Sequence, residues 1–157
     1  MKMKTFAAPW SSLLIGISVL ATVICIGIVI LGVFQHRAMV MGAAPLALMM
    51  GCALFTVRGY AITPEAILVK RLFWDTRLPR AGLESATFLP GAMKGSLRTC
   101  GNGGFYSFTG RYWNRGMGNY RAFVTDGARS VVLRYAGRTF VVSPGDPEGF
   151  VRELTAS

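Results

Sequence analysis

LLIGISVLATVICIGIVILGVF, residues Leu13–Phe34, is a run of 22 uncharged residues whose polar side chains are Ser18 and Thr22. Such hydroxyls can bond back to carbonyls of their own helix, so they need not interrupt it. At about 1.5 Å per residue the run reaches roughly 33 Å, enough to cross a hydrocarbon core of about 30 Å. It therefore predicts a transmembrane helix over about 13–34. A cleaved signal peptide is the alternative, but the run is too long for one.

A second apolar run, Met39–Val57, follows after about four residues. Its 19 uncharged residues span roughly 28 Å as a helix, and a kink at Pro45 is tolerated in a bilayer. A domain of this size has nothing large enough to surround such a helix, which argues against a buried core helix. The short connection makes the two helices antiparallel neighbours, so residues 1–57 are predicted to form a membrane anchor.

The distribution of basic residues predicts the orientation of this hairpin. Arg37 lies in the turn between the helices, whereas several cations lie at the opposite end of the hairpin, before the first helix and after the second. These are Lys2, Lys4, Arg58, Lys70 and Arg71. The positive-inside rule then places both chain termini in the cytoplasm and the turn at His36-Arg37 outside. The three cysteines, of which two lie in the apolar runs, are expected to be free thiols.

The composition changes sharply at Arg58. Residues 58–157 carry 14 of the 17 basic residues and all 7 acidic ones, so this part has a net charge of about +7. About 100 residues suffice for one compact domain. The sequence thus predicts a C-terminal domain over 58–157.

Short runs rich in Val, Ile, Phe, Tyr and Thr alternate with turn residues in this domain, which is typical of an all-β fold. Asp126-Gly127 and Ala136-Gly137 separate successive runs and predict hairpin turns in a meander. The predicted strands are 60–63, 66–71, 76–80, 105–109, 120–125, 130–135 and 138–143.

The end of the chain changes to a helical pattern. Asp146 is suited to an N-cap, Pro147 to the first helical position and Glu148 to the first turn. Phe150 and Leu154 then fall on one face at helical spacing. One closing amphipathic helix that packs on the sheet is expected.

The order of these elements, a run of strands followed by one helix, resembles the pleckstrin homology (PH) superfold. The resemblance is to small bacterial PH-domain proteins with two N-terminal transmembrane helices. It implies a bent, partly open barrel of about seven strands capped by the C-terminal helix, in the bacterial inner membrane, and it implies no catalytic activity. The stretches that carry it are Gly59–Thr63, Ile67–Arg71, Gly101–Gly104, Gly110–Tyr112, Phe123–Asp126 and Val142–Phe150.

The residues themselves offer little for catalysis. The one histidine, His36, lies in the predicted turn on the far side of the membrane, so Cys100 has no histidine partner in the domain. The seven carboxylates show no repeated spacing, which argues against a metal site. Gly101–Gly104 lacks the Gly-Lys-Ser/Thr ending of a phosphate loop and is expected to be a flexible turn. We therefore expect no enzyme activity, no metal and no cofactor.

Cations and aromatics interleave between Lys94 and Arg121, and again at residues 70–74. An exposed cation near an anionic leaflet gains about 1 kcal/mol, so these residues are candidates for lipid or partner binding. The alternative is that half of the aromatics form the barrel core and the arginines an ordinary solvated face. Nucleic-acid binding uses the same residue types, but no such module is recognisable. The candidates are Lys70, Arg71, Trp74, Arg111, Trp113 and Arg115.

Three functions follow from these observations. The first is a non-enzymatic binding or scaffold protein, which presents the domain at the cytoplasmic membrane face to protein partners or to its own copies. The second is recognition of anionic lipid headgroups through the basic residues. The third is a small accessory subunit of a membrane enzyme or transporter, with the chemistry supplied by a partner.

Overall fold

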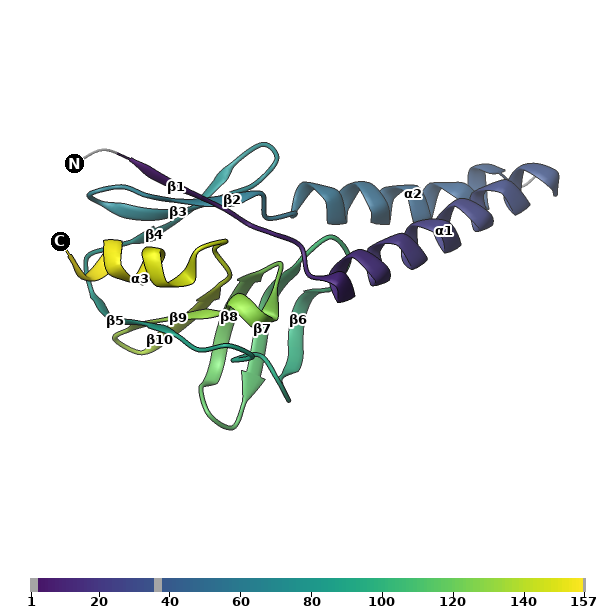
Figure 1. Ribbon diagram of the computed structural model, residues 1–157. Helices are drawn as coiled ribbons and strands as arrows, with labels where there is room; N and C mark the ends of the chain where they lie inside the picture. The colour runs from purple at the N-terminus through teal and green to yellow at the C-terminus, as the bar shows by residue number, and fades with distance from the viewer. Residues whose placement is uncertain (1–2, 36–37, 157) are drawn as a thin grey trace.

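The computed structural model describes residues 3–35 and 38–156 (Figure 1). Two long helices extend from one end of a β domain, and a third helix lies against the domain. The helices are α1 (Ser12–Phe34), α2 (Ala38–Leu54) and α3 (Pro147–Thr155). The strands are β1 (Lys4–Ala7), β2 (Gly59–Ile62), β3 (Ala66–Lys70), β4 (Asp75–Pro79), β5 (Leu83–Phe88), β6 (Leu97–Gly103), β7 (Phe108–Asn114), β8 (Gly118–Val124), β9 (Val131–Tyr135) and β10 (Arg138–Val142).

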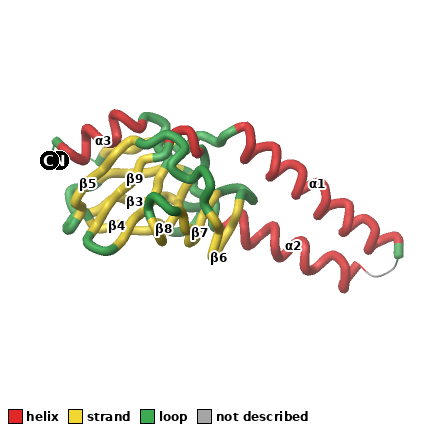
Figure 2. Tube along the Cα trace, turned by 90° about the horizontal axis from the view of Figure 1, so that it is seen from below, coloured by secondary structure: helices red, strands yellow, loops and turns green. Residues whose placement is uncertain are grey.

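Helices α1 and α2 lie side by side and project away from the strands (Figures 1 and 2). The hydroxyl of Ser11 caps α1 by accepting the N–H of Leu14 at 3.2 Å. Within the described residues, α1 is the one helix long and apolar enough to cross a membrane, and the apolar part of α2, Gly42–Leu54, is shorter. The second helix ends at Leu54, three residues before the predicted end. The predicted turn at His36-Arg37 lies outside the described residues.

Strand β1 precedes α1 and pairs antiparallel with β2, the strand that follows α2. It forms the edge of a four-stranded sheet in the order β1-β2-β3-β4. Strand β1 was not predicted, because four residues are too few to show a strand pattern and they lie beside an apolar helix. As a result, both ends of the helix pair enter the same sheet.

The second sheet has six strands in the order β5-β9-β10-β8-β7-β6. Ala136-Gly137 forms the predicted tight hairpin between β9 and β10. The prediction of a hairpin turn at Asp126-Gly127 is wrong: this dipeptide leads into a short 3₁₀ helix, Gly127–Arg129, and β10 lies parallel to β8 between β8 and β9. The meander is therefore interrupted, because β9 does not pair with β8, and β10 returns to lie between them.

Strands β5 and β6 were not predicted, and β7 begins three residues later than expected. The stretch Gly101–Gly104 was expected to be a flexible turn, but Gly101–Gly103 lie in β6, where Gly101 stands opposite Gly110 of β7, and only Gly104 lies in the turn that follows. A side chain on Gly110 would overlap the carbonyl oxygen of Cys100. These glycines allow the close approach of two strands, a role that the turn pattern conceals.

The main core lies between the two sheets and is closed by α3. Asp146 caps α3 by accepting the N–H of Gly149 at 2.9 Å, which confirms the predicted start of the helix. Phe150 is fully buried and meets Phe6 of β1 edge to face at 5.1 Å between ring centres. Tyr60 is also fully buried, and its hydroxyl accepts the N–H of Ser143 at 3.0 Å. The mainly-β domain with a C-terminal helix is thus PH-like, with more strands than the seven expected.

Candidate binding sites at the base of the helices

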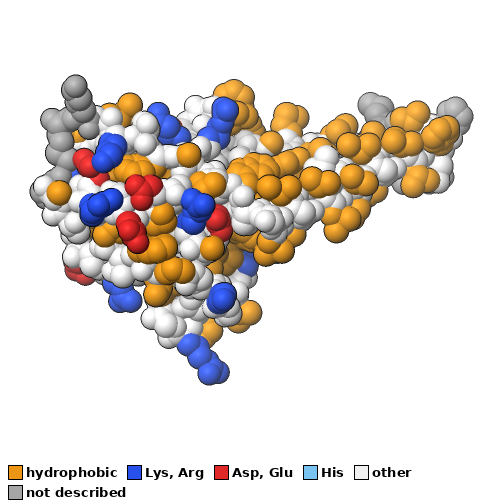
Figure 3. All heavy atoms as spheres, in the orientation of Figure 1, with side chains coloured by type: hydrophobic (Ala, Val, Ile, Leu, Met, Phe, Trp, Pro, Cys, Tyr) orange, Lys and Arg blue, Asp and Glu red, His pale blue; other side chains and the backbone are white. Residues whose placement is uncertain are grey.

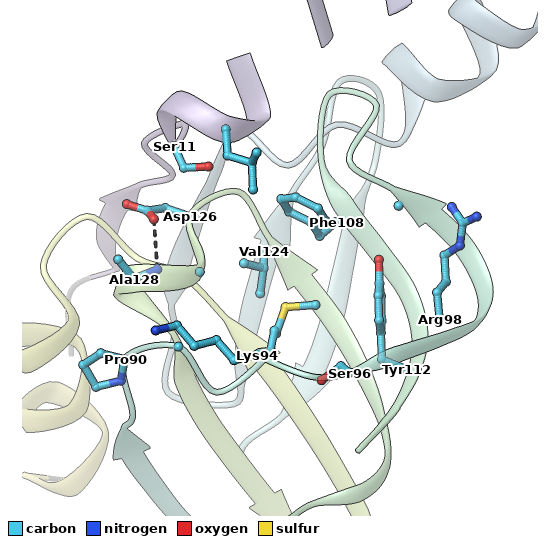
Figure 4. Close-up of a pocket in the computed structure, with 15 residues that line it drawn as sticks. Ser11, Pro90, Lys94, Ser96, Arg98, Phe108, Tyr112, Val124, Asp126 and Ala128 are labelled. Atoms are coloured by element: carbon cyan, nitrogen blue, oxygen red, sulfur yellow. Dashed lines mark hydrogen bonds between the residues drawn. The ribbon is translucent and has the colours of Figure 1, made fainter. Parts of the chain in front are cut away.

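A cavity of about 690 Å³ lies where the start of α1 meets the β domain (Figure 4). The residues before β6, residues 90–96, form one wall, and β6, β7 and β8 form another. The residues that line it are Ser11, Leu13, Pro90, Gly91, Met93, Lys94, Ser96, Arg98, Gly103, Phe108, Tyr112, Val124, Asp126, Gly127 and Ala128.

This cavity is mainly apolar, with a few charged groups. Met93, Phe108 and Val124 supply its apolar surface, and Lys94 and Arg98 add two positive charges. One carboxylate, that of Asp126, is engaged by the N–H of Ala128 at 3.0 Å and by Arg129 at 3.3 Å. An apolar group beside an anion would match this lining.

Tyr112 is the one phenol in the cavity. Its hydroxyl donates to the carbonyl oxygen of Asn102 at 2.8 Å. Burial raises the pKa of Tyr112 to about 12, although the nearby charge of Arg98 acts to lower it. The phenol is therefore neutral at physiological pH and serves as a donor. Within residues 3–35 and 38–156, no group of three or more His, Cys, Asp or Glu side chains is placed to hold a metal ion.

A second cavity, of about 410 Å³, lies between α2 and the β domain. One wall is helical and apolar, and the other comes from the end of β3 and from β6, β7 and β8. The lining residues are Ala47, Leu48, Gly51, Cys52, Phe55, Arg71, Gly101, Asn102, Thr109, Gly110 and Arg121.

Arg71 is the most buried cation of this cavity, with 8% of its surface exposed. Its Nε donates to Thr76 at 3.1 Å, and its Nη1 donates to the carbonyl oxygen of Phe55, just past the end of α2, at 2.8 Å. The guanidinium lies 5.3 Å from the ring centre of Phe123. Burial lowers the pKa of Arg71, and the like charge of Arg121 lowers it further. Arg71 thus joins the end of α2 to the domain.

Arginines also face one another across the strands beside this cavity. Arg111 of β7 stands directly opposite Arg121 of β8, an arrangement of like charges that destabilises a sheet. A further hollow of about 380 Å³ is lined by both residues and by Arg138. The ion pairs found in the described part of the chain, Lys4–Glu153 and Arg129–Asp126, do not involve these three arginines.

The turn between β6 and β7 reaches along α1. The backbone N–H of Tyr106 donates to Ser18 at 3.0 Å, and its phenol lies 3.0 Å from the hydroxyl of Thr22. Thr22 also bonds back to the carbonyl oxygen of Ser18 at 2.7 Å, as the sequence analysis expected of this helix. The hydroxyl of Ser18 instead accepts a hydrogen bond from the turn. The sequence signal that could have revealed this contact is the presence of two hydroxyl residues, Ser18 and Thr22, in an otherwise apolar run.

The six candidate residues fall into two groups. Lys70, Arg71 and Trp74 lie at the end of β3 and in the turn to β4, with Arg71 buried and stacked 5.9 Å from the ring of Trp74. The other group lies on β7 and in the turn that follows it, with exposed side chains. It consists of Arg111, Trp113 and Arg115. The structure does not bring the six residues into one patch.

The alternative that some aromatics belong to the core is correct for two of them. Tyr112 and Tyr120 are buried and stack with ring centres 5.9 Å apart. Cys25, Cys52 and Cys100 are free, as predicted. The cavities are also lined by Lys94, Arg98 and Arg121, which belong to the mixed segment of cations and aromatics but are not among the six candidates.

Comparison with known proteins gives one match. The family model described as "Bacterial PH domain" matches residues 58–157. No curated protein and no solved structure matches the chain.

Proposed function

The chain belongs to the bacterial PH domain family, and from that premise we propose that it is a non-enzymatic, membrane-anchored binding protein. It presents its β domain to a protein partner at the cytoplasmic face of the bacterial inner membrane. The observation that carries this proposal is the pairing of β1 with β2. Because strands on both sides of the helix pair belong to one sheet, the domain is fastened to the base of the helices.

Both helices cross the membrane in this proposal. The 23 residues of α1 reach about 34 Å and the 17 of α2 about 26 Å. Most side chains of α1 are exposed and apolar, which suits a lipid environment. On the face shown in Figure 3 the helices carry no Lys, Arg, Asp or Glu, whereas the domain carries many. The basic domain favours the cytoplasmic side by the positive-inside rule.

The β6–β7 turn is held at membrane depth in this arrangement. Thr22 lies ten residues after Ser12, so the turn reaches about 15 Å along α1. The twelve residues from Thr22 to Phe34 add about 18 Å, too little to span the hydrocarbon core alone. We therefore expect the turn to enter the lipid interface. Irregular backbone is tolerated there when protein groups satisfy it, as Ser18 does for Tyr106.

The cavity at the start of α1 is the proposed partner site. Its apolar surface and its two cations fit a segment of a partner that carries an apolar side chain beside a carboxylate. Such a partner would itself be a membrane protein or lie at the membrane surface, because the cavity opens beside the start of α1. The net charge of the domain, about +7, favours an acidic segment.

Photo-crosslinking in native membranes tests this proposal. A photoreactive residue at Met93 is expected to give one discrete protein adduct, and the same probe at Arg134, exposed on β9 outside the cavity, is expected to give none. The double charge reversal Lys94→Glu with Arg98→Glu is expected to abolish the adduct. An adduct that survives the reversal would overturn the partner site, and release of the protein by alkaline carbonate would overturn the membrane anchor.

A further inference from the structure

We infer that the cavity between α2 and the β domain binds the phosphate group of a membrane phospholipid between Arg71 and Arg121, with an acyl chain along α2. This inference rests on the proposed membrane anchor. The cavity is separate from the partner site, since the two share no lining residue.

The polar side of the cavity carries positive charge without a compensating acid. Arg71 is buried, and it donates hydrogen bonds to a hydroxyl and to a carbonyl, both neutral groups. Neither Arg71 nor Arg121 takes part in an ion pair within the described residues. A buried charge is costly unless an opposite charge accompanies it. An anion in the cavity would supply that charge.

The arrangement of the arginines favours a phosphate over a single carboxylate. Arg71 and Arg121 line the same cavity, and Arg111 stands opposite Arg121 on the neighbouring strand. Guanidinium groups bind phosphate through paired, charge-assisted hydrogen bonds, and one phosphate can accept from several donors. A bound phosphate would offset the repulsion among these side chains.

The opposite wall is suited to a hydrocarbon chain. It is formed by α2, where Leu48 is 59% exposed and the small residues Ala47 and Gly51 leave space. A side chain added at Gly51 would meet no atom within 4 Å, so the groove is open there. An acyl chain in this groove would bury apolar surface at about 25 cal/mol per Å².

The depth of the cavity fits a lipid better than a protein segment. From Ala47 to Phe55 the helix rises about 12 Å, and over this distance the lining changes from apolar to cationic. A phospholipid at the membrane interface has the same order, from acyl chain to phosphate. The groove along α2 opens to the outside of this helix, and in the proposed anchor the outside of the helix is in contact with lipid.

The test compares phospholipid retained by the full-length protein after purification in mild detergent. Wild type is expected to retain phospholipid at a stoichiometric level, measured as lipid phosphorus per chain. Arg121→Gln is expected to bind phosphatidylglycerol in nanodiscs about tenfold more weakly, since it loses charge-assisted hydrogen bonds. Arg134→Gln is the matched control. This variant removes the same charge from the same sheet. Leu133 and Arg121 both pair with Phe140 and so share one face of the sheet, whereas Arg134, the next residue after Leu133, lies on the opposite face.

A second variant separates a lipid from a free phosphate. Gly51→Leu fills the apolar groove and leaves the arginines in place, so it is expected to lower lipid retention without changing the binding of inorganic phosphate. Equal retention by wild type and Arg121→Gln would overturn the inference, as would an equal loss in Arg134→Gln. Unchanged lipid retention in Gly51→Leu would overturn the lipid assignment. In each case a variant that stays in carbonate-washed membranes leaves the proposed anchor intact.

Discussion

The backbone N–H of Tyr106 donates a hydrogen bond of 3.0 Å to the hydroxyl of Ser18, which joins the β6–β7 turn to the N-terminal third of an apolar helix. Tyr106 adopts a positive φ of 64°, unusual for a residue with a side chain. The hydroxyl of Ser18 also lies 3.5 Å from the carbonyl oxygen of Gly104, so it meets one donor and one acceptor of the turn. This one small polar side chain, together with the contact of Thr22 with the phenol of Tyr106, holds the turn on α1.

Replacing Ser18 by valine removes the acceptor and keeps a side chain of similar size. We expect the free energy of unfolding of the domain in mild detergent to fall by about 1–3 kcal/mol, because the N–H of Tyr106 loses its partner where water is scarce. The measurement is the urea midpoint followed by tryptophan fluorescence. Val19→Thr, on an exposed position beside it, is the control and is expected to change little. A Ser18→Val midpoint equal to that of wild type would contradict the prediction.

Gly59→Ala is expected to loosen β1. A Cβ at Gly59 would lie 2.9 Å from the carbonyl oxygen of Phe6, so the strands must separate. Hydrogen exchange should then lose protection at residues 4–7 while the β9–β10 hairpin keeps it. Gly127→Ala is the control, because a Cβ there meets nothing within 4 Å. Equal protection of β1 in both variants would show that the strand tolerates the side chain.

Gly110→Ala is expected to disrupt the pairing of β6 with β7. The new Cβ would overlap the carbonyl oxygen of Cys100, and the φ of 149° is strained for alanine. Such a site costs about 1–3 kcal/mol from the backbone alone. Gly137→Ala, with φ of 72° and open space around it, carries only the backbone cost. Thermal unfolding should therefore show a larger loss for Gly110→Ala, and equal losses would exclude the steric overlap.

Burial of the phenols of Tyr60 and Tyr112 should make the free energy of unfolding depend on pH in the alkaline range. Burial raises the pKa of each to about 12, from an ordinary value of about 10. Below pH 10 both the folded and the unfolded chain hold these protons, so they add no pH dependence. Between about pH 10 and 12 the unfolded chain releases protons that the folded chain keeps, so stability falls as the pH rises.

Absorbance at 295 nm measures this effect directly. In the folded protein two phenols should ionise only near pH 12, and unfolding should bring them to ordinary values. Tyr60→Phe should remove one of the two late transitions. If all phenols ionised together near pH 10 in folded protein, the burial of these groups would be in error.

Some elements could be predicted because their signals are local. The cap at Asp146, the hairpin turn at Ala136-Gly137 and the apolar run 13–34 each follow from a few neighbouring residues. Strand β6 has no such signal, since its sequence is rich in glycine and polar residues. Glycine there serves a close approach to β7, and only the partner strand makes that visible.

The candidate site shows the same division. Basic and aromatic residue types could be recognised in the sequence, but their grouping could not. Arg71 is adjacent to Lys70 in sequence and yet is buried, while Arg121, fifty residues later, lines the same cavity. Strand pairing and the end of α2 bring these residues together, and neither is encoded by local spacing.

The sequence by itself determined an apolar N-terminal segment, a basic β domain and a closing helix. These follow from hydropathy, charge and capping, which act between neighbours along the chain. The tertiary structure alone decided that β1 joins β2, that Ser18 accepts a hydrogen bond from Tyr106 and that Arg71 and Arg121 face the apolar wall of α2. Such long-range contacts form between surfaces that become buried against each other, and which surfaces do so is decided only when the whole chain packs.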